Sequence, residues 1–583
     1  MTQNSELSVW PPAALPSSTP GNASVAPDSL CLPVVQSQPL LRGSPEFEVK
    51  RAGLMRAFAA EIPAEYRLPL KLIRNPPTDV SKVPSTCGKL TAKEVAITEE
   101  YDAVELLQAI ANQTYTSVEV IIAFSKRAII AHQLTCCLTQ WFMKQAITRA
   151  TELDAYLAKH GRPIGPLHRL PVSVKDHMHI AGTFSSQGCI ESIVKDQEDC
   201  RIVASLRSQG AVFYCKTNQP QSLMHLETES HWGRVLNPYN IRLSAGGSTG
   251  GEAALIAMRG SVMGIGTDIG GSIRVPSAFC GVYGFKPTSS VLSIEGLITG
   301  APPPAILNVP ISAGPICRTL RDMDLCMQSL LSCGLHKSDH NVVPMTWTGL
   351  KTPLARRLKI GIVSNDGFID PQPPVKRAIA WAKGILEANK DLVEVKAFTI
   401  RGAEDAWSSI KKMYWPDGGR LTREAIQSGG EPVHPLTDWI CQDKTLTGMM
   451  TAAEMALVRQ KRDEFREAFA KSWKGQDVDV IIGPAFIGPA CSHDTALHWT
   501  YTSLYNLVDY PGVVFPTPIK SKHGEVYSKA YKPLSGACQH VKELWEDGVF
   551  ENAPVNLQIV APRYCDNQLF GALQLLRKIL SLA

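Results

Sequence analysis

Two glycine-rich segments with a short apolar stretch between them constrain the fold of this chain more than any other feature. The first reads AGGSTGG at 245–251, and the second reads GIGTDIGGSIRVP at 264–276. The residues between and within them predict a helix over EAALIAMRG and a strand over SVMGIGTD. Glycine tolerates positive φ and lets the backbone approach a ligand closely, so both segments can form tight loops. A helix followed by a returning strand would bring the second loop, with Ser272, beside the first, with Ser248.

Apolar runs outside these loops show a similar alternation of strand and helix. The segment LPVSVKDHMHIAG predicts a buried strand that carries Lys175, VASLRSQG predicts a helix, and AVFYCKTN predicts the next strand. Further along, RRLKIGIVS and VDVIIGPAF predict strands, and PPVKRAIAWAKGILEANK predicts a helix. Alternating strands and helices favour a parallel or mixed sheet that is covered on both faces. We therefore predict an α/β fold, a single large α/β/α domain with a central mixed β-sheet flanked by helices.

Composition divides the chain into three parts. Residues 1–45 are rich in Pro, Ser and Ala, and we expect them to be disordered. Residues 46–95 form a helical or irregular segment that Pro76 and Pro77 interrupt, and the main domain is expected over 96–583, with its core at about 170–300. Within that domain YDAVELLQAIANQ and QAITRATELDAYLAKH predict helices. Thr116 and Glu119 form a capping box before a third helix, VEVIIAFSKRAIIAHQ.

The charge and the distribution of apolar residues exclude several classes of partner. A net charge of +5 over 583 residues, with no basic block, argues against nucleic acid or an anionic membrane surface. No run approaches the roughly eighteen apolar residues of a membrane-spanning helix, and the first residues do not resemble a secretory signal. The 15 cysteines include no CxxC pair, which is typical of reduced and mostly buried thiols. These features predict a cytoplasmic protein without an integral membrane segment.

The whole region AGGSTGGEAALIAMRGSVMGIGTDIGGSIRVPSAFCGVYGFKPT resembles the signature region of the amidase signature hydrolases. The pair Lys175-Asp176 lies 73 residues before Ser248, and Ser248 lies 24 residues before Ser272, which are spacings similar to those of that family. The resemblance extends from about residue 96 to APVNLQIVAPRYCDNQLF near the end of the chain. TSVEVIIAFSKRA and GAVFYCKTNQPQSLM look most like the fungal acetamidase-type enzymes.

The resemblance implies a catalytic triad of two serines and one lysine. A serine hydroxyl needs a base within hydrogen-bonding reach to become a good nucleophile, and no histidine lies in the two glycine loops. A lysine can be that base if burial lowers its pKa. By resemblance, Ser272 is the nucleophile that forms an acyl-enzyme, Ser248 follows a cis peptide bond and relays the proton, and Lys175 is the general base.

The resemblance also implies which groups contact the substrate. Ser248 lies beside the substrate, and Leu223 corresponds to a position that lines the acyl pocket, although a plain core leucine is an equal alternative there. The substrate is a small carboxylic acid amide, the products are the acid and ammonia or an amine, and no cofactor or metal is required. The oligomeric state stays open, with a homodimer as one alternative. The oxyanion of the tetrahedral intermediate is expected to accept hydrogen bonds from the backbone N–H groups of Ile269, Gly270, Gly271 and Ser272.

Several residues near the triad have a second interpretation. Thr249 occupies a position where the family usually has serine, and its extra methyl group would crowd a tight loop. Asp268 and Arg274 flank the nucleophile loop and are predicted to form a structural ion pair. His177 and His179 would share one face of a strand and could suggest a metal site, but no third ligand is apparent.

Three alternative functions compete with amide hydrolysis. GGSTGG could bind phosphate, yet it lacks the GxxxxGK[ST] pattern and places Glu252 at a helix N-terminus. A glutaminase-type subunit of an amidotransferase complex would share the triad, but the N-terminal region resembles the fungal enzymes instead. A catalytically silent binding protein of the same fold is the third alternative, and the presence of Lys175, Ser248 and Ser272 argues against it.

Overall fold

Strands from both halves of the chain join in one mixed sheet, which is 11-stranded within residues 30–38, 40–298, 307–441 and 449–583, the parts that this computed structural model describes. The order is β1-β5-β2-β10-β12-β11-β16-β17-β15-β13-β14. Both parallel pairs, such as β2–β10, and antiparallel pairs, such as β10–β12, occur. The strand bounds are β1 Leu138–Trp141, β2 Pro171–Lys175, β5 Val212–Thr217, β10 Met263–Asp268, β11 Tyr283–Lys286, β12 Ser312–Cys317, β13 Leu358–Ile362, β14 Val393–Ala397, β15 Val480–Pro484, β16 Gly512–Lys520 and β17 Pro554–Val560.

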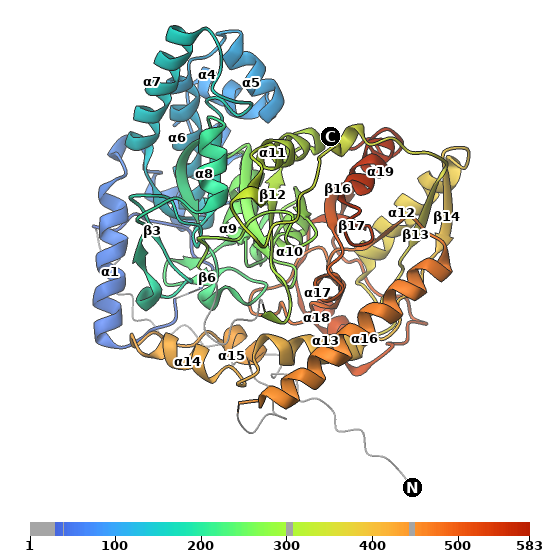
Figure 1. Ribbon diagram of the computed structural model, residues 1–583. Coiled ribbons are helices and arrows are strands. Elements are labelled where there is room, and N and C mark those ends of the chain that lie inside the picture. Colours follow the sequence, from blue (N-terminus) through green and yellow to red (C-terminus); the bar gives the residue numbers. More distant parts are fainter. Residues whose placement is uncertain (1–29, 39, 299–306, 442–448) are drawn as a thin grey trace.

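Helices surround this sheet, and three short ribbons lie outside it. The ribbons pair β3 Phe184–Ser185 with β4 Val194–Lys195, β6 Glu229–Ser230 with β7 Gly233–Arg234, and β8 Leu236–Asn237 with β9 Asn240–Ser244. In Figure 1, α4 to α7 project at one end, and α13 to α16 lie along the lower edge. The helix bounds are α1 Pro45–Ala60, α2 Leu70–Arg74, α3 Val83–Thr86, α4 Ala92–Glu99, α5 Ala103–Ala111, α6 Ser117–Thr135, α7 Met143–His160, α8 Arg201–Ser208, α9 Gly250–Ala257, α10 Arg274–Phe279, α11 Leu320–Ser332, α12 Pro373–Ala388, α13 Ala403–Tyr414, α14 Arg420–Gln427, α15 Pro435–Cys441, α16 Ala452–Gln476, α17 Thr500–Leu507, α18 Gly536–Asp547 and α19 Asp566–Ile579.

The central strands bury side chains on both faces of the sheet. In β16, Val513 and Phe515 belong to one hydrophobic cluster and Val514 to another, as the two-residue period of a strand requires. The first cluster includes residues of α6, α9, α11, α12 and α19, and the second includes residues of α10, α13, α17 and α18. The predicted mixed sheet with helices on both faces is therefore confirmed.

Most of the elements predicted in the first half of the chain are present with small changes at their ends. The capping box is formed: Thr116 Oγ1 accepts from the Glu119 N–H at 3.2 Å, and a Glu119 carboxylate oxygen accepts from the Thr116 N–H at 3.0 Å. Strand β2 ends at Lys175, so the lysine is its last residue. The predicted strands and helices around residues 212, 250 and 263 correspond to β5, α9 and β10.

Part of the N-terminal segment that composition predicts to be disordered is packed against helix α6. Of the expected disordered segment 1–45, residues 1–29 and 39 lie outside the described residues. Leu32 and Val35 are buried, and the Val35 N–H donates to the Gln133 carbonyl of α6 at 2.8 Å. Part of the segment expected to be disordered is thus packed, because these apolar side chains cover part of α6.

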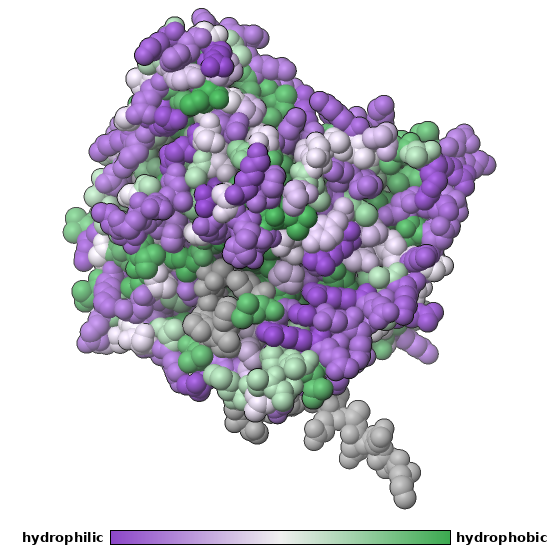
Figure 2. Space-filling view, viewed as in Figure 1, coloured by the Kyte–Doolittle hydropathy of each residue, from purple (hydrophilic) through white to green (hydrophobic). Residues whose placement is uncertain are grey.

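The surface and the thiols fit the expectations from composition. Hydrophilic residues cover most of the face in Figure 2, and hydrophobic residues form scattered groups on it. Among the described residues, none of the helices combines the length and the apolar character that crossing a membrane requires. Most of the 15 cysteines, all of which lie within the described ranges, are buried, and no disulfide bond joins them there.

The parallel pairing of β2 with β10 positions Lys175 and the second glycine-rich loop of the sequence. Gly264 pairs with Ser173 and Ile265 with Val174, so the carboxyl ends of both strands lie at the same edge of the sheet. Open α/β sheets bind ligands in crevices just beyond the carboxyl ends of their parallel strands. Lys175 and the loop after Asp268 therefore meet where a site is expected.

A buried arginine fixes the N-terminal helices to this domain. Arg127 of α6 donates to the Met258 carbonyl at 2.7 Å, to Thr98 Oγ1 at 2.9 Å and to a Glu99 carboxylate oxygen at 2.8 Å. Its side chain is only 1% exposed. Removing one partner of a buried pair leaves the remaining polar groups without compensation.

We expect Arg127→Ala to lower the free energy of unfolding by about 1–3 kcal/mol, because the buried Met258 carbonyl and Thr98 hydroxyl lose their donor. The measurement is urea denaturation followed by circular dichroism. Arg420→Ala is the matched control, since Arg420 forms an exposed pair with Glu424 on α14 and its loss should leave stability unchanged within error. Equal unfolding midpoints for the two variants would contradict the prediction.

Candidate active site

Lys175 and Ser248 form a direct contact between two buried side chains. Lys175 Nζ lies 2.6 Å from Ser248 Oγ, and the two residues are 1% and 2% exposed. Burial lowers the pKa of Lys175 to about 7, while the nearby Asp268 carboxylate acts in the opposite direction. A substantial fraction of this amine is therefore neutral near physiological pH, with a lone pair that can accept a proton.

The loop that carries Ser248 needs glycine for two separate reasons. Gly246 has a φ of 80°, which side chains disfavour, and the peptide bond between Gly247 and Ser248 is cis. A Cβ at Gly247 would lie 2.7 Å from backbone atoms of Glu227, and one at Gly251 would lie 2.5 Å from the Asn218 nitrogen. These glycines allow close packing of backbone on backbone, which holds Ser248 against the end of β2.

Ser272 lies in the next loop, between β10 and α10, and is 5% exposed. The Thr249 N–H donates to the Ser272 carbonyl at 3.1 Å, which joins the two glycine loops. Among the described residues no hydrogen bond links Ser248 Oγ to Ser272 Oγ. A nucleophile and its base are often farther apart before substrate binds than during the reaction.

A buried ion pair shapes the loop that carries Ser272, as the sequence predicted. Arg274 Nε and Nη2 donate to the two carboxylate oxygens of Asp268, both at 3.0 Å. Asn506 of α17 bonds both members of the pair, at 2.9 Å to Asp268 and at 2.6 Å to Arg274. The Arg274 guanidinium and these hydrogen bonds hold the pKa of Asp268 below its usual range against the effect of burial.

In the loop that carries Ser272, some backbone N–H groups donate a hydrogen bond and others do not. The Gly271 N–H donates to Asp268 Oδ1 at 2.8 Å, so it already has a partner. Within the described chain the N–H groups of Ile269, Gly270 and Ser272 make no hydrogen bond. The Ile269 carbonyl accepts from the Tyr414 hydroxyl, and the Gly270 carbonyl accepts from Thr502 Oγ1 at 2.8 Å. Because Tyr414 and Thr502 bind these carbonyl groups, the three N–H groups without a partner stay available for an anion.

Two residues that the sequence analysis did not assign to catalysis lie next to Lys175. Thr267 Oγ1 is 3.4 Å from Lys175 Nζ and 3.0 Å from His177 Nε2. His177 Nδ1 is 2.9 Å from the Ile298 carbonyl oxygen. Thr267 stands five positions before Ser272 in the same motif, but its contact with Lys175 depends on the pairing of β2 with β10.

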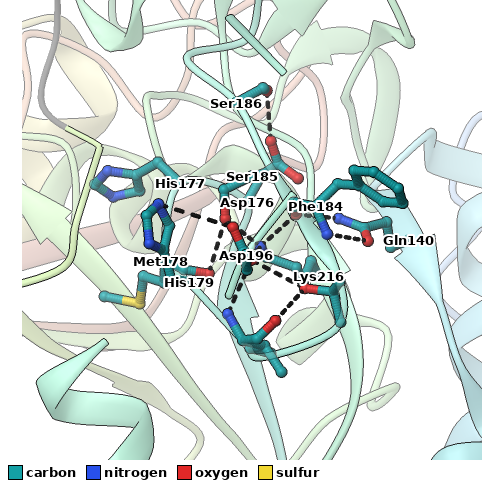
Figure 3. A network of polar contacts seen from close by, with 12 residues as sticks. Gln140, Asp176, His177, Met178, His179, Phe184, Ser185, Ser186, Asp196 and Lys216 are labelled. Carbon is teal, nitrogen blue, oxygen red and sulfur yellow. Dashed lines mark hydrogen bonds and ion pairs between the residues drawn. The ribbon is translucent and has the colours of Figure 1, made fainter. Parts of the chain in front are cut away.

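The two histidines do not form a shared metal site. Both follow the end of β2, whereas a common strand face was expected, and they have different partners. His179 Nε2 lies 3.8 Å from Asp196 Oδ1, in a cluster where Lys216 pairs with Asp196 at 3.2 Å (Figure 3). Asp176, next to Lys175 in sequence, instead accepts from the Ser186 hydroxyl at 2.6 Å (Figure 3).

One other group of potential metal ligands occurs in the described residues, and an arginine already occupies it. Glu229, His434 and Asp494 offer ligand atoms close together. Arg234 bonds both carboxylates, at 2.8 Å to Asp494 and more closely to Glu229. His434 Nδ1 accepts from the Leu436 N–H at 3.1 Å, so its Nε2 carries the proton and points a donor at the carboxylates. The group is an ion-pair cluster.

Leu223 and Thr249 also have defined surroundings. Leu223 is 8% exposed, has a φ of 65° and belongs to neither of the two hydrophobic clusters of the described residues, which argues against a plain core leucine. Thr249 is fully buried, and its methyl group faces Gly266, where a Cβ would lie 2.5 Å from it. The lack of a side chain at Gly266 thus makes room for the methyl group that distinguishes threonine from serine.

Known proteins resemble the chain in both sequence and structure. The Amidase family model matches residues 119–570. A Schizosaccharomyces pombe protein that carries the name amidase is 40% identical over 85% of this chain and 92% of its own length. The acetamidase of Emericella nidulans is 34% identical over 91% of this chain and 97% of its own. A solved structure of a fatty acid amide hydrolase superposes with a TM-score of 0.85 at 31% identity, covering 93% of this chain and 95% of that one.

We expect Gly266→Ala to destabilise the protein by about 1–3 kcal/mol, because the new methyl group overlaps that of Thr249. Thr249→Ser should cost about 1 kcal/mol by removing a buried methyl group, and the double variant should cost less than the sum. Urea denaturation measures all three. Gly475→Ala on α16, where the added Cβ contacts nothing, is the control and should not destabilise. Simple additivity of the two costs would contradict the proposed packing.

Proposed function

Because this chain belongs to the amidase family of hydrolases, we propose that it hydrolyses a monocarboxylic acid amide to the acid and ammonia or an amine through a relay of two serines and a lysine. The contact of Lys175 with Ser248 at 2.6 Å is the observation that carries this proposal. A buried amine with a pKa of about 7 is suited to accept a proton at neutral pH. The relay needs only groups of this chain and water, so no cofactor takes part.

The first half of the reaction forms an acyl-enzyme. Lys175 accepts the proton of Ser248, Ser248 accepts that of Ser272, and Ser272 Oγ attacks the amide carbonyl carbon. The negative charge on the carbonyl oxygen is stabilised by the N–H groups of Ile269, Gly270 and Ser272. When the tetrahedral intermediate collapses, the C–N bond breaks and the leaving amine takes a proton back through the same relay.

The second half releases the acid. Water loses a proton to the relay and attacks the ester carbonyl, and the same three N–H groups stabilise the second tetrahedral intermediate. The Ser272 oxygen leaves and is reprotonated, which restores the starting state. Each of these N–H groups contributes substantially, since the loss of one oxyanion donor typically lowers the rate by about 10²–10³.

The names of relatives give the range of amides to test. The Emericella nidulans relative carries the name acetamidase, and the structural relative reported above carries the name fatty acid amide hydrolase. We propose Leu223 as a residue on the acyl side of the pocket, because it is buried and lies outside both core clusters. A panel of short aliphatic, arylacetic and long-chain amides, with ammonia or amine release as the signal, identifies the acyl group preferred.

Ser272→Ala should lower amide hydrolysis by at least about 10³-fold while the circular dichroism spectrum stays unchanged, because the attacking oxygen is lost. A fluorophosphonate probe should label Ser272 in the wild type and not in this variant. Ser277→Ala is the control, because within the described ranges the Ser277 hydroxyl donates to the Ile273 carbonyl alone, at 2.7 Å. Wild-type turnover in Ser272→Ala would refute the assignment, and a wild type that neither is labelled nor hydrolyses any amide would favour a silent binding protein.

The pH dependence of kcat/KM should show an acid limb near pH 7. Below the pKa of Lys175, about 7, the amine is protonated and cannot accept a proton, so the rate falls about tenfold per pH unit. Above it the rate reaches a plateau. Lys175→Ala should leave a small activity that rises with pH and has no plateau near 7, and an unchanged profile in that variant would exclude the relay.

A further inference from the structure

The ring of His177 lies between a hydroxyl and a carbonyl group on the far side of Thr267 from Lys175. Its Nδ1 is 2.9 Å from the Ile298 carbonyl oxygen, and its Nε2 is 3.0 Å from Thr267 Oγ1. The residue is 1% exposed, so both ring nitrogens depend on these two partners. The partners determine where the protons lie.

A carbonyl oxygen only accepts hydrogen bonds, so the Nδ1 atom of His177 must carry a proton. Burial lowers the pKa of His177 to about 3, and the charge of Lys175 acts in the same direction, so the ring is neutral. In a neutral imidazole the other nitrogen has a lone pair. His177 Nε2 therefore accepts the hydroxyl proton of Thr267.

The hydrogen bond to His177 determines whether the Thr267 hydroxyl donates to Lys175 or accepts from it. A threonine hydroxyl has one proton, and here it is given to His177, so only a lone pair faces Lys175 Nζ at 3.4 Å. A neutral amine has two N–H groups and one lone pair. One N–H of Lys175 is directed at Thr267, so the lone pair of the neutral amine can face Ser248 Oγ, which lies 2.6 Å from Nζ.

We propose that His177 is a positioning residue that acts through Thr267 to keep the lone pair of Lys175 available to Ser248. The inference rests on the proposed function, because it assigns His177 a part in the same relay. Without an acceptor at position 177, the Thr267 hydroxyl is free to rotate and donate its proton to Lys175. Thr267 would then compete with Ser248 for the one lone pair of the base.

The charged groups around the pair support the same proton arrangement. Lys175, Lys216 and His179 face His177 and lower its pKa, which disfavours an imidazolium. Asp268 faces Lys175 and raises its pKa, against the larger effect of burial.

The test compares His177→Leu, which removes the acceptor, with His177→Gln, whose amide oxygen can still accept from Thr267. The readout is the rate at which a fluorophosphonate labels Ser272 of the full chain, measured from pH 5 to 10, because this rate needs the base but no particular amide. We expect His177→Leu to lower the rate at least about tenfold and to move the acid limb to lower pH, since a hydrogen bond to the neutral amine favours it. His177→Gln should stay within about threefold of the wild type.

Thr267→Val provides the matched background. If His177 acts through Thr267, then His177→Leu should change the labelling rate by less than about threefold once the Thr267 hydroxyl is absent. The proposal would be overturned if His177→Leu lowered the labelling rate equally in both backgrounds. It would also be overturned if His177→Leu and His177→Gln lowered the rate equally and neither moved the acid limb of the pH profile. A wild type that is not labelled at Ser272 would instead refute the proposed function, and this inference with it.

A measurement on the wild type tests the proton positions even if the leucine variant does not fold. In ¹⁵N-histidine-labelled protein at pH 7, the signals that disappear in His177→Gln should be those of a neutral ring protonated at Nδ1. Signals of an Nε2-protonated ring or an imidazolium would overturn the proposal.

Discussion

The burial of one amine beside one hydroxyl is the interaction on which the rest of this site depends. Lys175 would be a cation in water, and its place at the end of β2, with Ser248 Oγ at 2.6 Å, makes it a base near neutral pH. Desolvation alone would lower the pKa of the lysine further, and the carboxylate of Asp268 limits the shift. The same carboxylate also accepts hydrogen bonds from Arg274 and from the Gly271 N–H, so one residue connects the charge of Lys175 with the geometry of the loop that carries Ser272.

The register of the sheet and the close approach of backbone to backbone at the glycines bring the side chains of this site together. Parallel pairing of β2 with β10 places Lys175 beside Thr267, and the glycines around Ser248 permit contacts that any side chain would prevent. The two hydrophobic clusters hold the sheet from both faces. Helices α13 and α17 of the second cluster supply Tyr414 and Thr502, which bind the carbonyl groups of the nucleophile loop.

The sequence predicts the parts of the site that are encoded by short-range patterns. The two glycine loops, a buried strand that carries Lys175 and the Asp268–Arg274 pair all follow from residues close together in the chain. His177 was singled out only as a metal ligand, because its contact with Thr267 depends on strand register. Tyr414 and Thr502 gave no signal, since nothing local indicates which carbonyl a hydroxyl will meet. Strand β16 lacks a clear pattern because Pro516 and Pro518 interrupt it, although β16 pairs with β11 and β17 in the sheet.

The contact of Asn506 with Asp268 and Arg274 has a consequence for the newly made protein. The side chain that ties the nucleophile loop is translated 232 residues after Arg274, and β16 and β17 are translated later still. Until Asn506 and these strands have been made, the Asp268–Arg274 pair lacks one of its partners and the sheet lacks strands from its middle. The loop that carries Ser272 therefore gains this contact only when the last quarter of the chain folds back into the middle of the sheet.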